Sequence, residues 1–459
     1  MSAPPARALS PDPATTASDP PRTSDEPLRP STFSSLRTRN FRLFAMGQLV
    51  SNTGSWVQRI AQDWVVLTIT GSATAVGITT MLQFLPTLLF GLHGGLLADR
   101  YSKRHILIVT QIGLAAMATT LAVLTLSNRI DVWHVYLVAF GLGVIVALDN
   151  PARQAFVNEM VGPRHLLNAI SLNASIFQLG ALIGPAVSGV LIGLVGPGYA
   201  FTINAVSYLA PISMLVLIRR AELHLSSAPA SVQHVGAGLL AVLRRPEMLW
   251  PTVIASVFGV FTINLPVTLA AYAKTVFHSG SAGYGYLCST VAVGSVVGAL
   301  ISARRSRTTL RSIAGVGAAL AVTEMLAAAA PGQVTFCILL FTVGAATLLL
   351  LTAANSAVQM TADASTRGRI MSVYLVVFIG SGAIGGPVLG FIDQRFGPQV
   401  GMLLAGALPA TVTGVIAVAL ARRRGLRLHL QLDRPRGWPI TVVPAGGGPA
   451  RRPTGATRS

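Results

Sequence analysis

The chain has 459 residues, of which 52% are hydrophobic and only 11% are charged. Soluble domains carry about 25% charged residues, so this composition excludes an ordinary soluble enzyme. The remaining charge is one-sided, with 34 Lys and Arg against 15 Asp and Glu and a formal net charge of +19. The positions of the basic residues must therefore decide between a nucleic-acid binder and a membrane protein.

The elements predicted along the chain are membrane-spanning helices, because a helix needs about 20 apolar residues to cross the hydrocarbon core. A first set of such runs lies at 41–70, 75–97, 106–127, 131–149, 168–195 and 199–218. A second set lies at 249–274, 282–302, 312–330, 333–356, 369–391 and 399–421. The predicted fold class is an all-α membrane protein with twelve transmembrane helices in two pseudo-symmetric six-helix bundles.

Polar segments divide the chain into five predicted parts. Residues 41–218 form an N-terminal bundle and residues 249–421 a C-terminal bundle, joined by a basic cytoplasmic linker at 219–248. Residues 1–40 are rich in Pro, Ser and Thr, and residues 422–459 in Arg, Pro and Gly. By composition, both terminal segments are predicted to be disordered and cytoplasmic.

The basic residues cluster on one side of the predicted membrane. All but four of the 34 lie in the termini and in alternate loops; the exceptions are Arg59, Arg129, Lys274 and Arg395. This is the positive-inside pattern, and it predicts that both termini lie in the cytoplasm. The arginines are spread over many loops and form no single stripe. The pattern therefore favours membrane topology and contact with anionic lipids of the cytoplasmic leaflet, and argues against a nucleic-acid partner.

Two unrelated features repeat at nearly one offset along the chain. The segment 95–104 recurs 203 residues later at 298–307, and Gly184-Pro185 recurs 202 residues later as Gly386-Pro387. Parallel six-helix repeats with a substrate site near the bilayer midplane are a transporter architecture.

The loop after the second predicted span is the most specific motif in the chain. Its key residues are Gly95, Asp99, Arg100, Lys103 and Arg104. Asp99 is placed for a charge-assisted bond to a cation or a helix N-terminus, which could latch one conformation of the bundles. Ser302 replaces this acid in the second-half copy, so the latch is predicted in the first half only. The segment resembles the signature loop of the major facilitator superfamily, with Ser102 where that family usually has Gly.

The fifth predicted span carries small residues at helical spacing. They are Gly180, Gly184, Pro185 and Gly189. One-turn glycine spacing makes a face for close helix packing, and proline kinks the helix. The segment resembles the antiporter motif of exporters in the same superfamily, with Ser188 replacing one of its paired glycines. Generic tight packing is the alternative interpretation.

The first predicted span is unusually polar. Arg59 and Asp63 stand four residues apart and can pair on one helix face. Because ionisable groups inside a membrane are costly, we interpret Asp63 as a candidate proton-coupling acid with Arg59 as its counter-charge. The alternative is that both residues lie near the external rim. Asn52 and Gln62 of this span are candidates for lining a cavity.

Polar residues in later spans supply further candidates. Glu324 is a second candidate proton-coupling acid. Asp149 and Arg153, at the cytoplasmic end of the fourth span, are interpreted as a second latch rather than a substrate site. Asn204 and Asn264 could line a cavity.

The sequence contains no motif for nucleotide hydrolysis, metal binding or catalysis. There is no P-loop, no metal-ligand spacing and no catalytic cluster, so no cofactor, metal or enzymatic activity is predicted. Cys288 and Cys337 are interpreted as small hydrophobic residues. An aromatic belt near the span ends, rather than an aromatic drug pocket, is the interpretation of five residues: Trp56, Trp64, Trp133, Trp250 and Tyr272.

Over nearly all of 35–421 the chain resembles the enterobactin-exporter-like, or transmembrane secretion effector, branch of the major facilitator superfamily. The stretches 56–64, 149–156 and 167–185 carry this resemblance. It implies a monomeric secondary transporter in the bacterial cytoplasmic membrane that exports a small amphipathic drug, siderophore or secondary metabolite by proton antiport. A facilitator or importer of the same fold, a transport partner of a separate ATPase, and a non-transporting receptor or scaffold are the alternatives.

Overall fold

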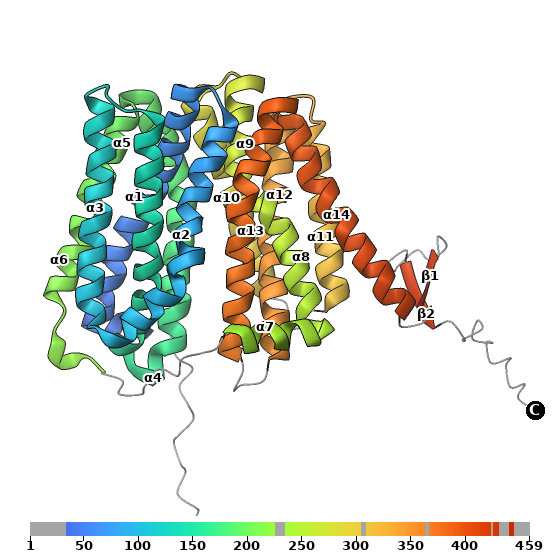
Figure 1. The fold of residues 1–459 in the computed structure, drawn as a ribbon, viewed down its shortest axis with the longest axis horizontal. Coiled ribbons are helices and arrows are strands. Elements are labelled where there is room, and N and C mark those ends of the chain that lie inside the picture. Colours follow the sequence, from blue (N-terminus) through green and yellow to red (C-terminus); the bar gives the residue numbers. More distant parts are fainter. Residues whose placement is uncertain are drawn as a thin grey trace, which may run out of the picture.

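The computed structural model describes residues 34–224, 235–303, 309–362, 367–423, 426–430 and 440–444. Its helices form two bundles that stand side by side (Figure 1). The first bundle contains η1 (Ser34–Arg37), α1 (Arg39–Thr70), α2 (Ala73–Arg100), α3 (Lys103–Leu126), α4 (Val132–Val195), α5 (Pro197–Ser207) and α6 (Leu209–Leu217). The second contains α8 (Pro246–Thr262), α9 (Leu265–Ala271), η3 (Tyr272–Val276), α10 (Gly280–Ala303), α11 (Leu310–Ala328), α12 (Gln333–Thr361), α13 (Arg367–Phe396) and α14 (Pro398–Arg423).

Helix ends follow from local residue chemistry. Gly196 and Gly397 have φ values of 88° and 89°, which favour glycine, and each is followed by a proline that begins the next helix. These two Gly-Pro turns stand at equivalent places in the two halves. Asp131 caps α4 in a capping box with His134. Gly162, with φ 65° and ψ 178°, breaks α4 into two spans that run in opposite directions.

Eleven segments of the described chain are long and apolar enough to cross a membrane. They match eleven of the twelve predicted spans, with shifted ends. The predicted first span, α1, does not meet this criterion because it is too polar. It nevertheless packs along α4, α5 and α6 in the first bundle. The fourth span was predicted to end at residue 149, but it continues to Gly162, so Asp149 lies inside the helix.

The two bundles meet through glycines near one end, which we call the contact end, where α1 ends at Thr70 and α2 begins at Ala73. A Cβ atom built on Gly77 of α2 would lie 2.0 Å from the carbonyl oxygen of Gly386 in α13. A Cβ built on Gly285 of α10 would lie 2.5 Å from the Cα of Gly189 in α4. The largest apolar cluster crosses this interface. Its buried members include Val66 and Ala75 from the first half and Leu269 and Tyr284 from the second.

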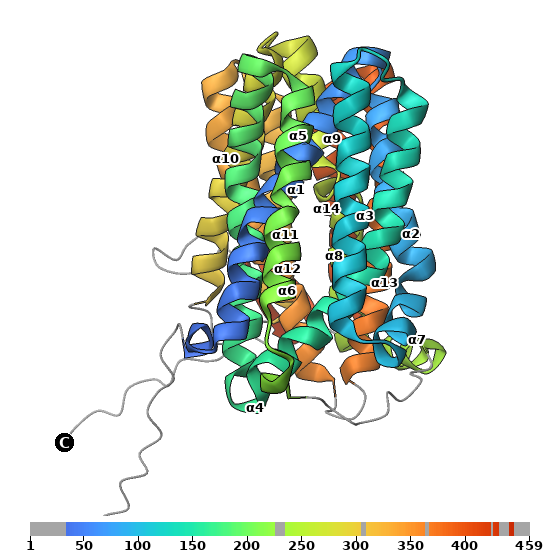
Figure 2. The same ribbon diagram turned by 90° about the vertical axis from the view of Figure 1, so that its left-hand side faces the viewer.

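The segments outside the spans also contain regular structure. The predicted linker 219–248 includes η2 (Arg220–Glu222) and α7 (Val235–Arg244), and α7 lies across the second bundle opposite the contact end (Figures 1 and 2). Val242 packs there against Met248 and Ile370. The predicted disordered tail contains an antiparallel pair of strands, β1 (Leu426–Leu430) and β2 (Ile440–Pro444). Alternating leucines and a β-branched run favour these strands, which composition alone did not reveal.

The variant Gly285→Ala tests the glycine crossing. Its new Cβ would meet Gly189 at 2.5 Å and the carbonyl oxygen of Pro185 at 2.7 Å, so we expect the melting temperature of the purified protein to fall. Gly315→Ala in α11 is the matched control because nothing lies within 4 Å of its new Cβ. The control should gain up to about 1 kcal/mol from helix propensity. If Gly285→Ala raised the melting temperature as much as Gly315→Ala, the close packing of Gly285 against Gly189 would be contradicted.

Candidate functional site

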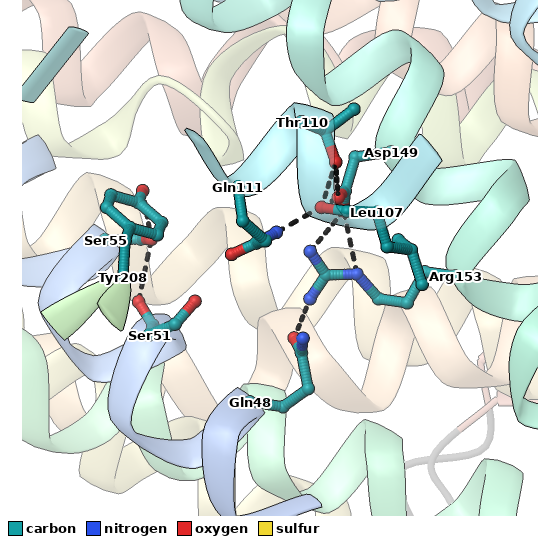
Figure 3. Close-up of polar contacts among 9 residues, drawn as sticks. All are labelled: Gln48, Ser51, Ser55, Leu107, Thr110, Gln111, Asp149, Arg153 and Tyr208. Carbon is teal, nitrogen blue, oxygen red and sulfur yellow. Dashed lines mark hydrogen bonds and ion pairs between the residues drawn. The ribbon is translucent and has the colours of Figure 1, made fainter. Parts of the chain in front are cut away.

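A buried ion pair joins three helices in the first bundle (Figure 3). Asp149 of α4 is 2% exposed. Its carboxylate accepts bonds from Thr110 Oγ1 at 2.7 Å, Gln111 Nε2 at 3.1 Å and Arg153 Nε at 2.8 Å. A second guanidinium nitrogen of Arg153 binds Gln48 of α1. The predicted pairing of Asp149 with Arg153 is therefore present, but the sequence did not identify the three uncharged partners. The pair ties α1, α3 and α4 together.

The signature loop between α2 and α3 binds elements of its own half. Lys103 forms an ion pair with Glu159 of α4 at 3.0 Å. Arg104 donates to the carbonyl oxygens of Leu215 and Val216 at the end of α6, at 2.7 and 2.8 Å. Arg100 is exposed and Gly95 is half-buried. The side chain of Asp99 lies outside the described part of the structure, so its predicted bond stays a prediction.

The second half carries an uncharged counterpart of this region. Ser302 Oγ and Thr352 Oγ1 are 2.7 Å apart. These residues stand 203 positions after Asp99 and Asp149 respectively. Small hydroxyls thus occupy the second-half positions that correspond to two acids in the first half, so the charged latch motif is confined to the first half.

The small-residue motif of the fifth span faces two different neighbours. A Cβ on Gly184 would lie 2.3 Å from the Cβ of Trp56, and one on Gly180 would lie 3.1 Å from the backbone of Asn52, so both glycines pack on α1. Gly189 instead packs against Gly285 of the other half. The carbonyl oxygen of Pro185, one helical turn earlier, lies close to the same Gly285. Ser188, the departure from the motif, donates to the carbonyl oxygen of Val57 at 2.9 Å.

Two of the four predicted cavity-lining amides donate hydrogen bonds to protein groups. Asn204 Nδ2 donates to Gln58 Oε1 at 2.6 Å. Asn264 Nδ2 donates to the carbonyl oxygens of Val260 and Gly382 at 2.7 and 2.9 Å. Both side chains are buried, and these bonds hold helices together, while Asn264 Oδ1 has no partner among the described residues. Asn52 is half-buried against the fifth span. Gln62, which is 1% exposed, has no partner for either amide atom among the described residues.

Arg59 and Asp63 point to different partners. Asp63 is 2% exposed, and its Oδ2 accepts a bond from Tyr284 of α10 at 3.1 Å. The guanidinium of Arg59 lies over the rings of Phe84 at 5.0 Å and Trp56 at 5.6 Å. Within the described chain, the predicted ion pair between Arg59 and Asp63 is not formed.

The aromatic belt was the wrong interpretation for two tryptophans. Trp56 stands fourteen residues before the end of α1 and contacts Phe177 at 5.8 Å. Trp64 stacks on Tyr284 across the two halves, with ring centroids 6.1 Å apart. Both rings therefore pack against other aromatic side chains of the protein.

Two isolated acids lie in the second bundle. Glu324 of α11 is 1% exposed, and its Oε2 has no partner among the described residues. Asp393 of α13 accepts a bond from Thr268 at 2.8 Å, while its Oδ1 has no partner in the described structure. Asp393 was missed because the eleventh span was predicted to end at residue 391, whereas the helix continues to Phe396.

Side chains of the second half also bind the α1–α2 turn at the contact end. Lys274 Nζ donates to the carbonyl oxygen of Leu67 at 2.8 Å, near the C-terminus of α1. Gln394 Oε1 accepts from the backbone N–H of Ala73 at 2.7 Å, at the N-terminus of α2. Each side chain matches the partial charge of the helix end that it binds. With the Asp63–Tyr284 bond, three hydrogen bonds close this end.

Comparison with known proteins identifies one family, and the similar proteins are named as transporters. Residues 30–431 match the transmembrane secretion effector family. The multidrug efflux pump Tap of Mycolicibacterium fortuitum is 24% identical and covers 84% of this chain and 97% of its own length. The staphyloferrin A transporter of Staphylococcus aureus is 29% identical over 34% of this chain and 39% of its own length.

A solved structure has the same arrangement of helices. It is a bacterial homolog to the human lysosomal transporter Spinster, in an inward-facing and occupied conformation. It matches with a TM-score of 0.67 at 14% identity and covers 84% of this chain and 97% of that chain. A likeness at this identity concerns the fold alone.

Removing one partner of the buried ion pair tests its role in stability. Arg153→Leu leaves the Asp149 carboxylate without its cation, and we expect a loss of about 3 kcal/mol or more, measured as a lower melting temperature. The double variant Asp149→Asn with Arg153→Leu keeps an acceptor for Thr110 but removes the charge, so it should recover part of the loss. A double variant no more stable than Arg153→Leu would contradict this account.

Proposed function

This chain belongs to the transmembrane secretion effector family of the major facilitator superfamily, and from that premise we propose that it exports a small amphipathic compound by secondary active transport. The family and the fold are those of multi-pass membrane transporters. The relatives described above are named for multidrug efflux and for staphyloferrin A transport, and bacterial transporters of this kind lie in the plasma membrane. These names support a drug, siderophore or secondary metabolite as the exported compound.

The observation that carries transport is the pair of glycine crossings between the two bundles at the contact end. Gly77 crosses Gly386, and Gly189 crosses Gly285. Helix backbones approach closely at such crossings, and the same end also carries apolar contacts such as that of Trp64 with Tyr284, so opening must unpack both. The three hydrogen bonds of this end can break together as the halves rock. This geometry supports alternating access around a site near the midplane.

We assign the contact end to the external side of the membrane. The positive-inside pattern supports this orientation, because the loops at the opposite end carry most of the basic residues. Both termini then lie in the cytoplasm, and anionic lipids of the cytoplasmic leaflet meet these arginines. The chain acts as a monomer in this proposal.

We assign the exchanged proton to Glu324 and a gating role to Asp63. Glu324 is buried without an ion pair in the described structure, and an intramembrane carboxylate of this kind is a candidate for proton transfer. It shares a helix face with Gly317, seven residues earlier, which packs against Phe258 of α8. Asp63 already accepts a bond from Tyr284 of the other half, so its charge state is tied to closure of the contact end.

Two alternatives predict different fluxes. A facilitator of the same fold would move its substrate without dependence on an outwardly acidic pH gradient, and an importer would not show efflux accelerated by that gradient. A receptor or scaffold, the alternative of another class, would show no flux in liposomes that contain only this protein. Flux in those liposomes would also exclude the need for a separate ATPase.

Efflux from proteoliposomes under an imposed pH gradient, screened across a panel of amphipathic compounds, tests the proposed function. With the compartment facing the contact end made acidic, we expect accelerated efflux of at least one compound. Glu324→Gln should abolish the acceleration by the gradient while downhill flux persists, because an amide cannot exchange a proton.

Asp63→Asn is the matched control for that experiment. It also removes one buried acid, but we expect it to change the rate of flux while the dependence on the gradient is retained. If Glu324→Gln keeps full coupling, the assignment of the proton is wrong. If no compound is transported by the unmodified protein, the receptor or scaffold alternative is favoured.

A further inference from the structure

We propose that Arg59 binds the acidic group of the transported compound, so that the substrate class is an amphipathic anion with a carboxylate or a similar group. This inference rests on the proposed transport function and adds the chemistry of its cargo. It does not depend on which acid carries the proton.

The first argument is depth in the membrane. Arg59 stands eleven residues before the end of α1, and Phe84 stands eleven residues after the start of α2. At 1.5 Å per residue, both lie about 16 Å from the contact end. The hydrocarbon core is about 30 Å thick, so the two side chains are near its midplane. Transporters with parallel repeats hold their substrates at this depth.

The second argument is the unused hydrogen-bonding capacity of the Arg59 guanidinium. Arg59 is half-buried, and no hydrogen bond or ion pair of its guanidinium is found within the described chain. Asp63, one turn along the same helix, interacts with Arg59 electrostatically, but its carboxylate accepts its hydrogen bond from Tyr284. By contrast, Arg153 binds Asp149 directly, and Lys274 at the contact end donates to the carbonyl oxygen of Leu67. A cation inside a membrane whose N–H groups have no acceptor is costly and is a candidate for binding a ligand.

The third argument is the geometry of the guanidinium. Phe84 and Trp56 lie against Arg59, with its central carbon 5.0 and 5.6 Å from the ring centroids. Aromatic rings attract the charge of the guanidinium but offer its N–H groups no oxygen acceptor. Since no hydrogen bond of the guanidinium is found within the described chain, its N–H groups have no acceptor there. They can therefore donate two parallel hydrogen bonds to a carboxylate.

The surroundings of Arg59 suit the remainder of an amphipathic molecule. Trp56 also contacts Phe177 of α4, so aromatic rings from three helices gather beside the cation. Gln62 is three residues further along α1, on the neighbouring part of the same helix face. It is buried, and both its amide oxygen and its amide nitrogen have no partner among the described residues. The amide offers one donor group and one acceptor beside the acidic group of a ligand.

Direct binding to the full-length protein in lipid nanodiscs tests the inference without any transport measurement. The probes are a panel of aromatic carboxylic acids, each paired with its own methyl ester, and binding is measured by equilibrium dialysis against empty nanodiscs. We expect at least one acid to bind about tenfold or more tightly than its ester, as a charge-assisted bond would give. A panel in which no acid binds more tightly than its ester would overturn the proposal.

Variants distinguish recognition from a structural role of Arg59. Arg59→Gln should bring acid and ester to within about twofold of each other, and Arg59→Lys should keep part of the preference because the charge remains. Arg395→Gln removes an exposed charge near the end of α13 and should change nothing. If Arg59→Gln folds with an unchanged melting temperature and keeps the full preference for acids, the proposal is wrong. If Arg59→Gln does not fold, Arg59→Lys provides the test. A stable Arg59→Lys variant that shows no preference for acids over esters would also overturn the proposal, because the cation would then be present without effect.

Failure of the transport proposal is distinguishable from failure of this one. Acid-selective binding that depends on Arg59, together with no flux in proteoliposomes, would leave the anion site standing and reject transport. Proton-driven flux of neutral or cationic compounds only, with no selectivity for acids in binding, would support transport and reject the anion site.

Discussion

The hydrocarbon core offers no partner to a polar group, and this constraint organises the whole structure. Asp149 satisfies this constraint by accepting hydrogen bonds from three side chains. Asn204 donates to Gln58, and the amide nitrogen of Asn264 donates to two carbonyl oxygens. Polar residues that satisfy each other in this way stabilise the bundles and are not available for chemistry. Arg59 differs, because aromatic faces hold it while its hydrogen-bonding capacity is unused in the described structure. Incomplete hydrogen bonding, rather than burial, is therefore the basis on which we propose a role for Arg59.

The same constraint explains how the halves stay together and how they can part. Lipid tails are as apolar as leucine, so helices in a membrane associate through close packing rather than through a hydrophobic force. The glycine crossings supply that packing at the contact end. The opposite end of the first bundle is instead held by charge, through Arg153 and through Lys103 with Glu159. In the second half, Ser302 and Thr352 form an uncharged contact at the corresponding place. The two halves thus share a fold but differ in the forces that hold them.

The spans and the repeat could be predicted from the sequence, because hydropathy and helix length respond to the bilayer directly. The pairing of Arg59 with Asp63 could not, because a spacing rule considers one helix while the partner of Asp63 stands 221 residues away. Helix ends were the other weakness. The apolar run stops at Asp149 although the helix continues, and Asp393 lies beyond a run that ends before it. Polar residues inside a helix were interpreted as its end, so Asp149 was placed at the end of its span and the buried Asp393 was missed.

The polarity of α1 has a consequence for how the protein is made. The eleven segments of the described chain that are long and apolar enough to cross a membrane begin at Ala73, after α1 has already been synthesised. An Arg or Asp at the centre of an isolated helix opposes insertion by about 2.5–3.5 kcal/mol, and α1 carries both Arg59 and Asp63. Asn204, the partner of Gln58, and Tyr284, the partner of Asp63, are translated much later. The polar side chains of α1 therefore lack these partners until the later helices are made. Biogenesis of this transporter is in this respect a tertiary folding problem from its first helix onward.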